Sequence, residues 1–372
     1  MNQDLYAVPV ELPTWQVGTP GTATFSWDYD EGRAHLLSLY QKGKSKQWDQ
    51  ELRIDWSVDT DPDDPLGLPE FMTPLYGSAL WAKLGRREKE ELKRHAAAWQ
   101  ISQFLHGEQG AMICSSRLVE SVPTLDAKFY AATQVMDEAR HAELFTRYVR
   151  EHIGLAYPMN RSLQQLLDDT LSDSRWDIPY LGMQVLIEGL ALASFGVLRD
   201  LTKAPLPKQI LAYVMQDEAR HVAFGRMALR EYYAELSDKE LHEREDFVID
   251  GCYLMRDRFR WCDVIENLGY SRPSSGDTLP NREALQLFQR VLFSRIVPCV
   301  RDIGLWTERV RAAFADIGVL EMAETNLETL MRRDEEIADQ LDAQRFAAEA
   351  QTRADEVAAT IHAGEASRDE VR

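Results

Sequence analysis

The sequence has few cysteines and no long uninterrupted apolar run. Its four cysteines, at positions 114, 252, 262 and 299, form no CxxC pair, which argues against a rubredoxin-type iron centre and a zinc ribbon. No run of about 18 apolar residues occurs, so no transmembrane helix is predicted. The first residues have no basic stretch followed by an apolar core, so no signal peptide is expected. These absences favour a reducing, cytoplasmic location.

Positive charge is also scarce. The 372 residues include 42 Lys and Arg against 61 Asp and Glu, which gives a formal net charge of −19. Such a surface repels nucleic acid and anionic membranes, so neither is an expected partner.

Proline and glycine divide the chain into three predicted regions. Residues 1–84 are rich in Pro, Gly, Trp and Asp, and are expected to wrap irregularly with one helix near 31–44. Residues 85–335 have a helical pattern almost throughout and are expected to form one domain. Residues 336–372 are rich in Ala, Glu, Arg and Asp, which favours a charged helix or a flexible tail.

Within the central region, apolar periodicity predicts four long helices. Helices of about 30 residues span roughly 45 Å, the length of a long four-helix bundle. Thr124 and Asp177 are the predicted caps of the second and third helices. The predicted helices lie near 88–120, 124–152, 177–203 and 207–236. The predicted fold class is all-α, a four-helix bundle with additional N- and C-terminal helical segments.

The pentapeptide DEARH occurs twice, at 137–141 and 217–221. In each copy Glu and His stand three positions apart, so both side chains leave the same helix face. Each motif glutamate is preceded, 30 residues earlier, by a glutamate on a predicted helix. The second of these, Glu188, stands among apolar residues, where a bare carboxylate would be costly to bury. The predicted metal ligands are Glu108, Glu138, His141, Glu188, Glu218 and His221.

Two less specific explanations remain for this pattern. A single Glu and His at this spacing is weak evidence, because such residues often form a surface pair. A purely structural role for all six residues, or an ancestral site that no longer binds metal, would also produce the pattern. The duplication and the two matched upstream glutamates favour the metal site.

The order Glu, ExxH, Glu, ExxH on four helices resembles the ferritin-like di-iron and di-manganese carboxylate bundles. Four carboxylates offset the repulsion between two cations about 3.5–4 Å apart. Ligands rich in oxygen and poor in nitrogen suit iron and manganese. The resemblance implies two iron ions, or a Mn/Fe pair, with dioxygen as co-substrate. No residue beyond the ligands is predicted to be catalytic, and no flavin or nicotinamide fingerprint predicts an organic cofactor.

The remaining charged residues of the two motifs are candidates to support the ligands. A metal-bound imidazole usually donates its other N–H to a carboxylate. In an antiparallel arrangement, Asp137 could reach His221 and Asp217 could reach His141. Arg140 and Arg220 would then pair with these aspartates. The alternative is that all four charged residues lie on solvated helix faces.

Several positions depart from known branches of this superfamily. Phe145 stands four residues after His141, where the ribonucleotide reductase small subunit usually has its radical tyrosine. Ala191 and Leu192 stand where bacterial hydroxylases and acyl carrier desaturases place a threonine. The ferritin-like arylamine N-oxygenases carry an extra histidine four residues before the last glutamate. Val214 occupies that position here and argues against membership of that group, although the overall size is similar.

Other branches of the superfamily also fit poorly. The N- and C-terminal extensions would obstruct a ferritin cage, and rubrerythrin-type peroxidases carry a CxxC iron domain that this sequence lacks. The oxygenase and oxidase members are the nearer resemblance, and their functions are the ones that the sequence predicts.

The predicted function is that of a dioxygen-activating di-iron monooxygenase or oxidase. The substrate is expected to be a small organic molecule that is hydroxylated, N-oxygenated or desaturated, and electrons to come from a ferredoxin or reductase partner. A homodimer is expected. The alternative is a non-catalytic ferritin-like protein, for iron handling or as the radical-generating subunit of a larger complex. The expected lining of the substrate pocket is Met112, Phe145, Ala191, Leu192 and Phe195.

Overall fold

The computed structural model consists of helices and loops, with no strand in the part of the chain that it describes. One isolated bridge pairs Tyr6 with Ala156. The all-α fold class predicted from the sequence is therefore confirmed. The structure describes residues 3–10, 14–18, 21–29, 32–258, 261–271 and 282–369.

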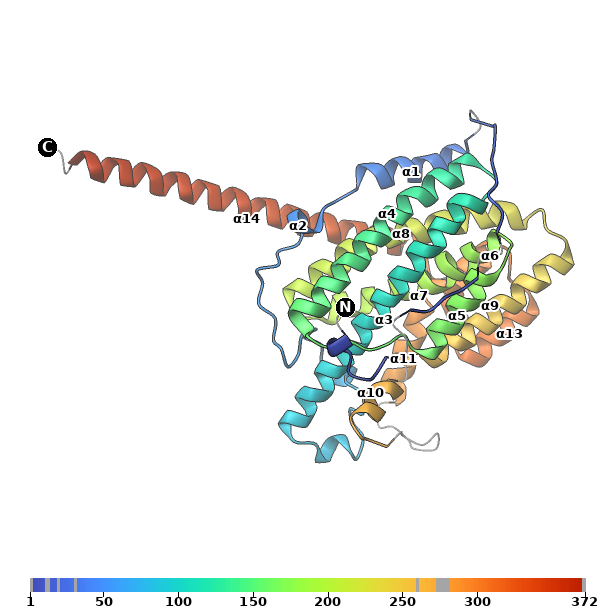
Figure 1. The fold of residues 1–372 in the computed structure, drawn as a ribbon, viewed down its shortest axis with the longest axis horizontal. Coiled ribbons are helices and arrows are strands. Elements are labelled where there is room, and N and C mark those ends of the chain that lie inside the picture. Colours follow the sequence, from blue (N-terminus) through green and yellow to red (C-terminus); the bar gives the residue numbers. More distant parts are fainter. Residues whose placement is uncertain are drawn as a thin grey trace.

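Four long helical segments form the centre of the molecule (Figure 1). The third is continuous, although its middle part has π-helical hydrogen bonds. Each of the four predicted helices is confirmed, with ends that differ by a few residues. The segments are α3 (Arg86–Ser121), α4 (Leu125–Tyr148), the stretch α6 (Asp177–Tyr180), η5 (Leu181–Ile187) and α7 (Glu188–Leu201), and α8 (Pro205–Tyr233).

The two predicted helix caps have different outcomes. Thr124 is the N-cap residue of α4, but its hydroxyl donates to Asp126 Oδ1 (2.6 Å) and caps no backbone N–H. The prediction for Asp177 is wrong, because Trp176 precedes the helix and Asp177 lies inside its first turn. The Asp177 carboxylate instead accepts two hydrogen bonds from the buried Arg244 of a neighbouring helix (2.9 and 3.0 Å).

The stretch Asp177–Leu201 is long and apolar enough to cross a membrane by composition alone. However, 83% of its apolar window is buried inside the protein. A central helix of a bundle is hydrophobic on all sides because other helices surround it. Its neighbours here include α8, α9 (Asp238–Arg258) and α12 (Ile296–Asp302).

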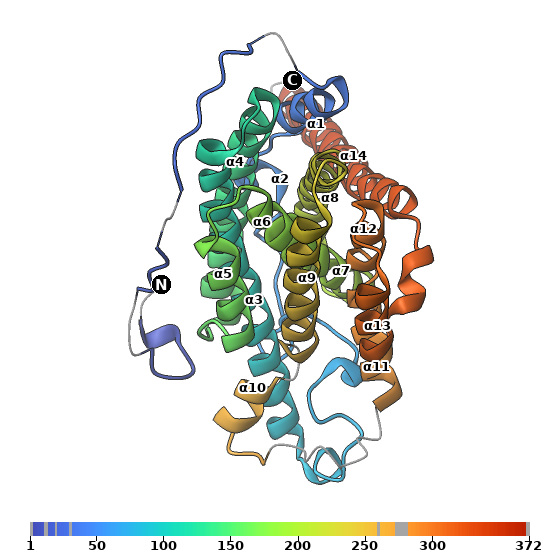
Figure 2. The same cartoon turned by 90° about the vertical axis from the view of Figure 1, so that its right-hand side faces the viewer.

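Shorter helices surround the four central segments (Figure 2). On one side α1 packs against α4 and α8, and on another α5 and α13 pack against α9. The shorter helices are α1 (Ala34–Ser45), α2 (Gln50–Arg53), α5 (Arg161–Ser172), α9 (Asp238–Arg258), α10 (Cys262–Asn267), α11 (Arg282–Leu292), α12 (Ile296–Asp302) and α13 (Glu308–Ile317). The single turns are η1 (Gln3–Leu5), η2 (Glu70–Met72), η3 (Trp81–Lys83), η4 (Val149–Ile153) and η6 (Leu320–Glu324).

The last helix, α14 (Leu327–Asp369), begins on the bundle and then projects away from it (Figure 1). Its first part packs against α8. Asp334 is buried there between Arg199 and Arg295, at 3.0 and 2.5 Å. Asp342 pairs with Arg53 at 2.7 Å, and the side chains beyond it are mostly exposed.

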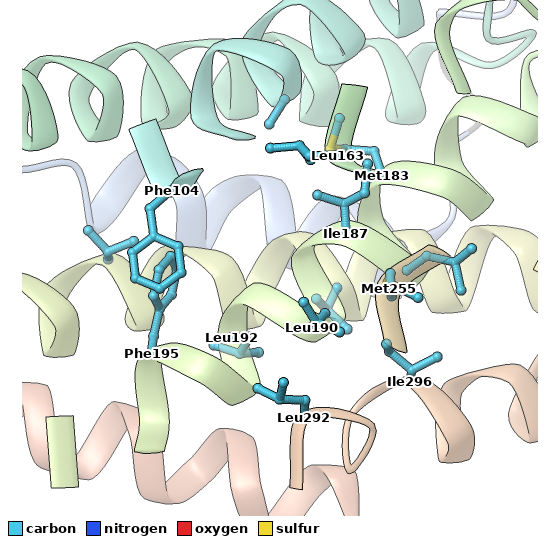
Figure 3. Close-up of a cluster of buried hydrophobic side chains, with 14 of the residues drawn as sticks. Phe104, Leu163, Met183, Ile187, Leu190, Leu192, Phe195, Met255, Leu292 and Ile296 are labelled. Atoms are coloured by element: carbon cyan, nitrogen blue, oxygen red, sulfur yellow. The ribbon is translucent and has the colours of Figure 1, made fainter. Parts of the chain in front are cut away.

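Apolar side chains fill the interior between the helices. Figure 3 shows Phe104 of α3 facing Phe195 of α7, with Leu192 and Leu292 nearby. The rings of Phe104 and Phe195 meet edge to face, with centroids 4.5 Å apart. Phe145 of α4 lies 5.9 Å from Phe104 and 6.0 Å from Phe195. These three rings form a compact phenylalanine cluster on the central helices.

Candidate metal centre

The structure brings the six predicted ligand residues together in the middle of the four-helix bundle. Their donor atoms fall into two groups of four, and within each group the atoms lie within 4.8 Å of one another. Position 1 is formed by Glu108, Glu138, His141 and Glu218. Position 2 is formed by Glu138, Glu188, Glu218 and His221. Glu138 and Glu218 belong to both groups, as carboxylates that bridge two ions would.

Helix geometry explains why these side chains converge. Glu138 and His141 of α4 are separated by three positions, so both point to the same side of the helix, and the same holds for Glu218 and His221 of α8. The upstream glutamates arrive from α3 and α7, which pack against α4 and α8 respectively. All six side chains are buried.

Several buried atoms at the centre have no hydrogen-bond partner. They are Oε2 of Glu138 and Glu188, both carboxylate oxygens of Glu218, and Nδ1 of His141 and His221. Buried polar atoms are nearly always satisfied, so this concentration of orphan atoms at one point requires an explanation. Metal ions supply one, because carboxylate oxygens and an imidazole nitrogen are the ligands that iron and manganese accept.

Burial acts strongly on the glutamates of the site. Burial, and then the negative charges of Glu218 and Glu138, raises the pKa of Glu188 well above its ordinary value. Burial and the charge of Glu218 raise the pKa of Glu108 in the same way. Burial also opposes protonation of the two imidazoles, but the surrounding carboxylates outweigh it and raise the pKa of each. Four carboxylates thus face two imidazoles, and without a cation the burial and mutual repulsion of Glu108 and Glu188 favour their protonated forms.

The two motif aspartates lie beside the histidine of the opposite motif. His141 Nε2 is 3.1 Å from Asp217 Oδ2, and His221 Nε2 is 3.2 Å from Asp137 Oδ2. With Nε2 held by a carboxylate, Nδ1 of each ring faces the glutamates. This geometry fixes the ring orientation that a metal ligand needs.

The motif arginines neutralise the two aspartates. Arg140 lies at 2.5 Å from Asp137 and 2.8 Å from Asp217, so it joins both halves of the site. Arg220 donates to Asp217 and lies 3.6 Å from Asp137. All four residues are buried, so the alternative of solvated helix faces does not hold for them.

Three residues that contact the site were not predicted from the sequence. Trp48 donates its indole N–H to Asp217 Oδ2 (2.8 Å), and Gln47 donates to Asp137 Oδ1 (2.7 Å). Both follow α1, about 90 or more positions before their partners. The third is Gln134, one helical turn before Glu138, whose amide contacts two ligands of the site. The only sequence signal for Gln134 is its place four positions before a ligand on the same helix face.

None of the three cavities described in this structure is lined by the five predicted pocket residues, so their role in a substrate pocket stays a prediction. Phe145, Leu192 and Phe195 are fully buried. Met112 and Ala191 are only half-buried. A small cavity of about 30 Å³ does lie between α3 and α7, but its walls include Gln100, Leu198 and Trp261 and none of the five.

Comparison with known proteins adds an independent result. The family model described as p-aminobenzoate N-oxygenase AurF matches residues 30–304. That range includes all six predicted ligands and most of the helices around them. None of the curated protein sequences compared with this chain matches it significantly.

Several solved structures resemble the chain at low sequence identity. Two variants of the R2-like ligand-binding oxidase, each with an anaerobically reconstituted Mn/Fe cofactor, align at a TM-score of 0.48. Their identities to this chain are 17% and 18%. Each alignment covers 75% of this chain and 96% of the oxidase.

Proposed function

This chain belongs to the p-aminobenzoate N-oxygenase AurF family, and from that premise we propose that it oxygenates the nitrogen of a small aromatic amine. The protein is a di-iron oxidoreductase of the ferritin-like superfamily, whose cofactor is a di-iron or Mn/Fe pair. Family membership corrects the inference drawn from Val214. This chain matches the family model although its residue 214 is a fully buried valine. The extra histidine is therefore not a condition of membership.

One observation carries the metal dependence of this proposed activity, namely the convergence of orphan oxygen and nitrogen atoms from six buried side chains. When bound, the metal pair supplies the reductive activation of dioxygen. The protein's own part is to hold the carboxylates and imidazoles in place. The Asp–His and Asp–Arg contacts do this through charge-assisted hydrogen bonds, which are roughly twice as strong as neutral ones.

The surroundings of the site favour an apolar, aromatic substrate portion. Phe104, Phe145 and Phe195 form the phenylalanine cluster on the same three helices that supply Glu108, Glu138 and Glu188. Aromatic rings pack well against such a cluster, in offset or edge-to-face geometry. Phe104 stands one helical turn before Glu108 and Phe145 one turn after His141, so we propose that these rings limit the access of water to the site and thereby strengthen its electrostatic contacts.

The chain holds no flavin or nicotinamide fingerprint, so we propose that electrons come from a ferredoxin or reductase. A homodimer and a cytoplasmic location are part of the same proposal. The absence of a CxxC pair accords with the reducing location.

The test is a single turnover of iron-reconstituted protein with a panel of aromatic amines. The reduced protein is exposed to oxygen, and products are identified by mass spectrometry. We expect metal analysis to approach two ions per chain and at least one amine to gain oxygen at nitrogen. Hydroxylation at carbon alone would contradict the proposed reaction. Growth of a ferric mineral without any product would instead support the iron-handling alternative.

A further inference from the structure

The two ends of the metal centre differ in chemistry although the motif is duplicated. Four positions before Glu138 stands Gln134, but four positions before Glu218 stands Val214. Likewise, Gln184 precedes Glu188 by four positions, whereas Phe104 precedes Glu108. Since residues four apart share a helix face, one end of the centre has two amides and the other has none at the matching positions.

The amide of Gln134 contacts two ligands directly. Its Nε2 donates to Glu188 Oε1 at 2.8 Å and to Glu138 Oε1 at 3.0 Å. Gln184 Nε2 in turn donates to Gln134 Oε1 at 3.1 Å, which fixes the orientation of the first amide. Both glutamines are buried, at 1% and 0% exposure, so water does not compete with these bonds.

Gln134 donates to Oε1 of both Glu138 and Glu188, so Oε2 of each carboxylate remains for another partner. Glu138 Oε2 and Glu188 Oε2 are the atoms without a hydrogen-bond partner. Glu108, the equivalent of Glu188 at the other end, has its Oε2 3.3 Å from His141 Nδ1. Its matching neighbours, Phe104 and Val214, have no side-chain donor.

We propose that Gln134 makes the two metal positions inequivalent, so that position 1, with Glu108 and His141, fills before position 2, with Glu188 and His221. This inference rests on the proposed metal centre. A donated N–H draws electron density from a carboxylate and occupies one of its lone-pair directions. Glu188 therefore has Oε2 left for a metal, while Glu108 receives no amide hydrogen bond of this kind. The amide also stabilises the metal-free carboxylates and thus competes with the ion at position 2.

Manganese(II) added to metal-free protein is a suitable probe, because single and paired Mn(II) ions differ in their electron paramagnetic resonance spectra. We expect one equivalent to give mainly the six-line signal of isolated Mn(II). A second equivalent should convert it to the spin-coupled signal of a pair. Calorimetry should resolve two dissociation constants about 10–100-fold apart, the usual effect of an outer-shell partner on metal affinity.

Variants assign the order of filling. Gln134→Val introduces the residue found at the matching position of α8, and should bring the two dissociation constants together and raise the paired signal at one equivalent. Glu188→Gln should abolish the second binding step and spare the first. Glu108→Gln should abolish the first. Circular dichroism of each variant checks that the helices remain folded.

The possible results distinguish a failure of the proposed inequivalence of the two positions from a failure of the proposed metal centre. Two equal binding steps in the wild-type protein would overturn the inequivalence but leave the centre standing. Loss of the first step in Glu188→Gln would overturn the order proposed. Unchanged dissociation constants in Gln134→Val would remove Gln134 as the cause. No Mn(II) binding by the wild-type protein would refute the centre and the inference together.

Discussion

At the scale of single residues, Glu188 depends most on the metal. It is buried on the apolar central helix, and its pKa is raised by burial and by neighbouring carboxylates. We expect Glu188→Ala to abolish metal-dependent oxygen consumption. We also expect the metal-free variant to be at least as stable as metal-free wild type, because a buried polar group has been removed. Urea midpoints of the two metal-free proteins test the stability. Metal contents of the two loaded proteins test the role of Glu188 as a ligand. Two tightly bound metals in the variant would refute the ligand assignment.

Asp217 accepts hydrogen bonds from residues on three parts of the chain. Trp48, Arg140 and Arg220 donate to it, and it lies beside His141. We expect Asp217→Asn to keep the fold but to weaken metal binding by about 10–100-fold, because an amide holds the His141 imidazole less firmly than a carboxylate does. Metal titration of the two proteins measures the loss. Wild-type affinity in the variant would mean that Asp217 has a structural role only.

His95 provides a pH-dependent contribution outside the metal centre. Its Nδ1 lies 2.7 Å from Tyr157 Oη, and burial lowers its pKa from the ordinary value of 6.5. The unfolded chain therefore binds this proton more readily than the folded one, so the folded state loses stability as the pH falls below about 6.5. We expect the stability of His95→Gln to fall less than that of the wild-type protein as the pH is lowered. The difference in unfolding free energy between the two proteins should shrink from pH 7 to pH 5. A constant difference would show that His95 does not titrate on unfolding.

Residue identity was sufficient to predict the ligands because the motif is duplicated and two glutamates match it. It was not sufficient for Trp48 and Gln47, because their contacts with the aspartates depend on how the segment after α1 folds back over α4 and α8. The Val214 inference failed for a related reason. It treated one position as decisive, whereas the six ligands already form two groups of four donors.

At the scale of helices, one glycine allows close packing beside the site. A Cβ on Gly225 of α8 would lie 2.5 Å from Gln184 Cβ and 3.7 Å from Tyr180. We expect Gly225→Ala to push η5 away from α8 and to destabilise the protein by about 1–3 kcal/mol, the usual cost of overpacking. The displaced Gln184 should also release Gln134. Urea unfolding measures the first effect and Mn(II) titration the second.

Gly107 of α3 is the matched control for that substitution. A Cβ there meets nothing within 4 Å. Alanine is about 1 kcal/mol more favourable than glycine inside a helix. Gly107→Ala should therefore be neutral or stabilising although it adjoins Glu108. Equal destabilisation by the two variants would contradict the packing argument.

Helix positions could be predicted well from apolar periodicity, since prolines and glycines lie at the breaks. The π-helical stretch Leu181–Ile187 could not, because its hydrogen-bond pattern has no periodic signature in seven residues. Local capping was also misjudged at Asp177. Its carboxylate is taken by Arg244 from α9, a tertiary contact that outweighs a helix-start preference.

At the scale of the whole molecule, α14 has two parts with different roles. Asp334 is buried between Arg199 and Arg295, and Asp342 pairs with Arg53, but the side chains described after Asp342 are mostly exposed. We expect removal of residues 347–372 to leave metal content and thermal stability nearly unchanged. Asp334→Ala in the full chain should lower stability, because it leaves two buried arginines without their shared carboxylate. Calorimetric unfolding compares the two. Strong destabilisation by the truncation alone would contradict this division.

The sharing of Glu138 and Glu218 between the two positions has a consequence for how fast metal leaves the protein. Position 1 takes three donors from α3 and α4 and one from α8, while position 2 takes three from α7 and α8 and one from α4. Neither helical hairpin can complete a coordination sphere alone, so each ion ties the two hairpins together. Escape of an ion then requires the hairpins to separate, and the exchange rate of bound metal should follow the opening rate of the bundle. We therefore expect iron bound in this site to be retained kinetically, with a lifetime set by the rate at which the helical bundle opens.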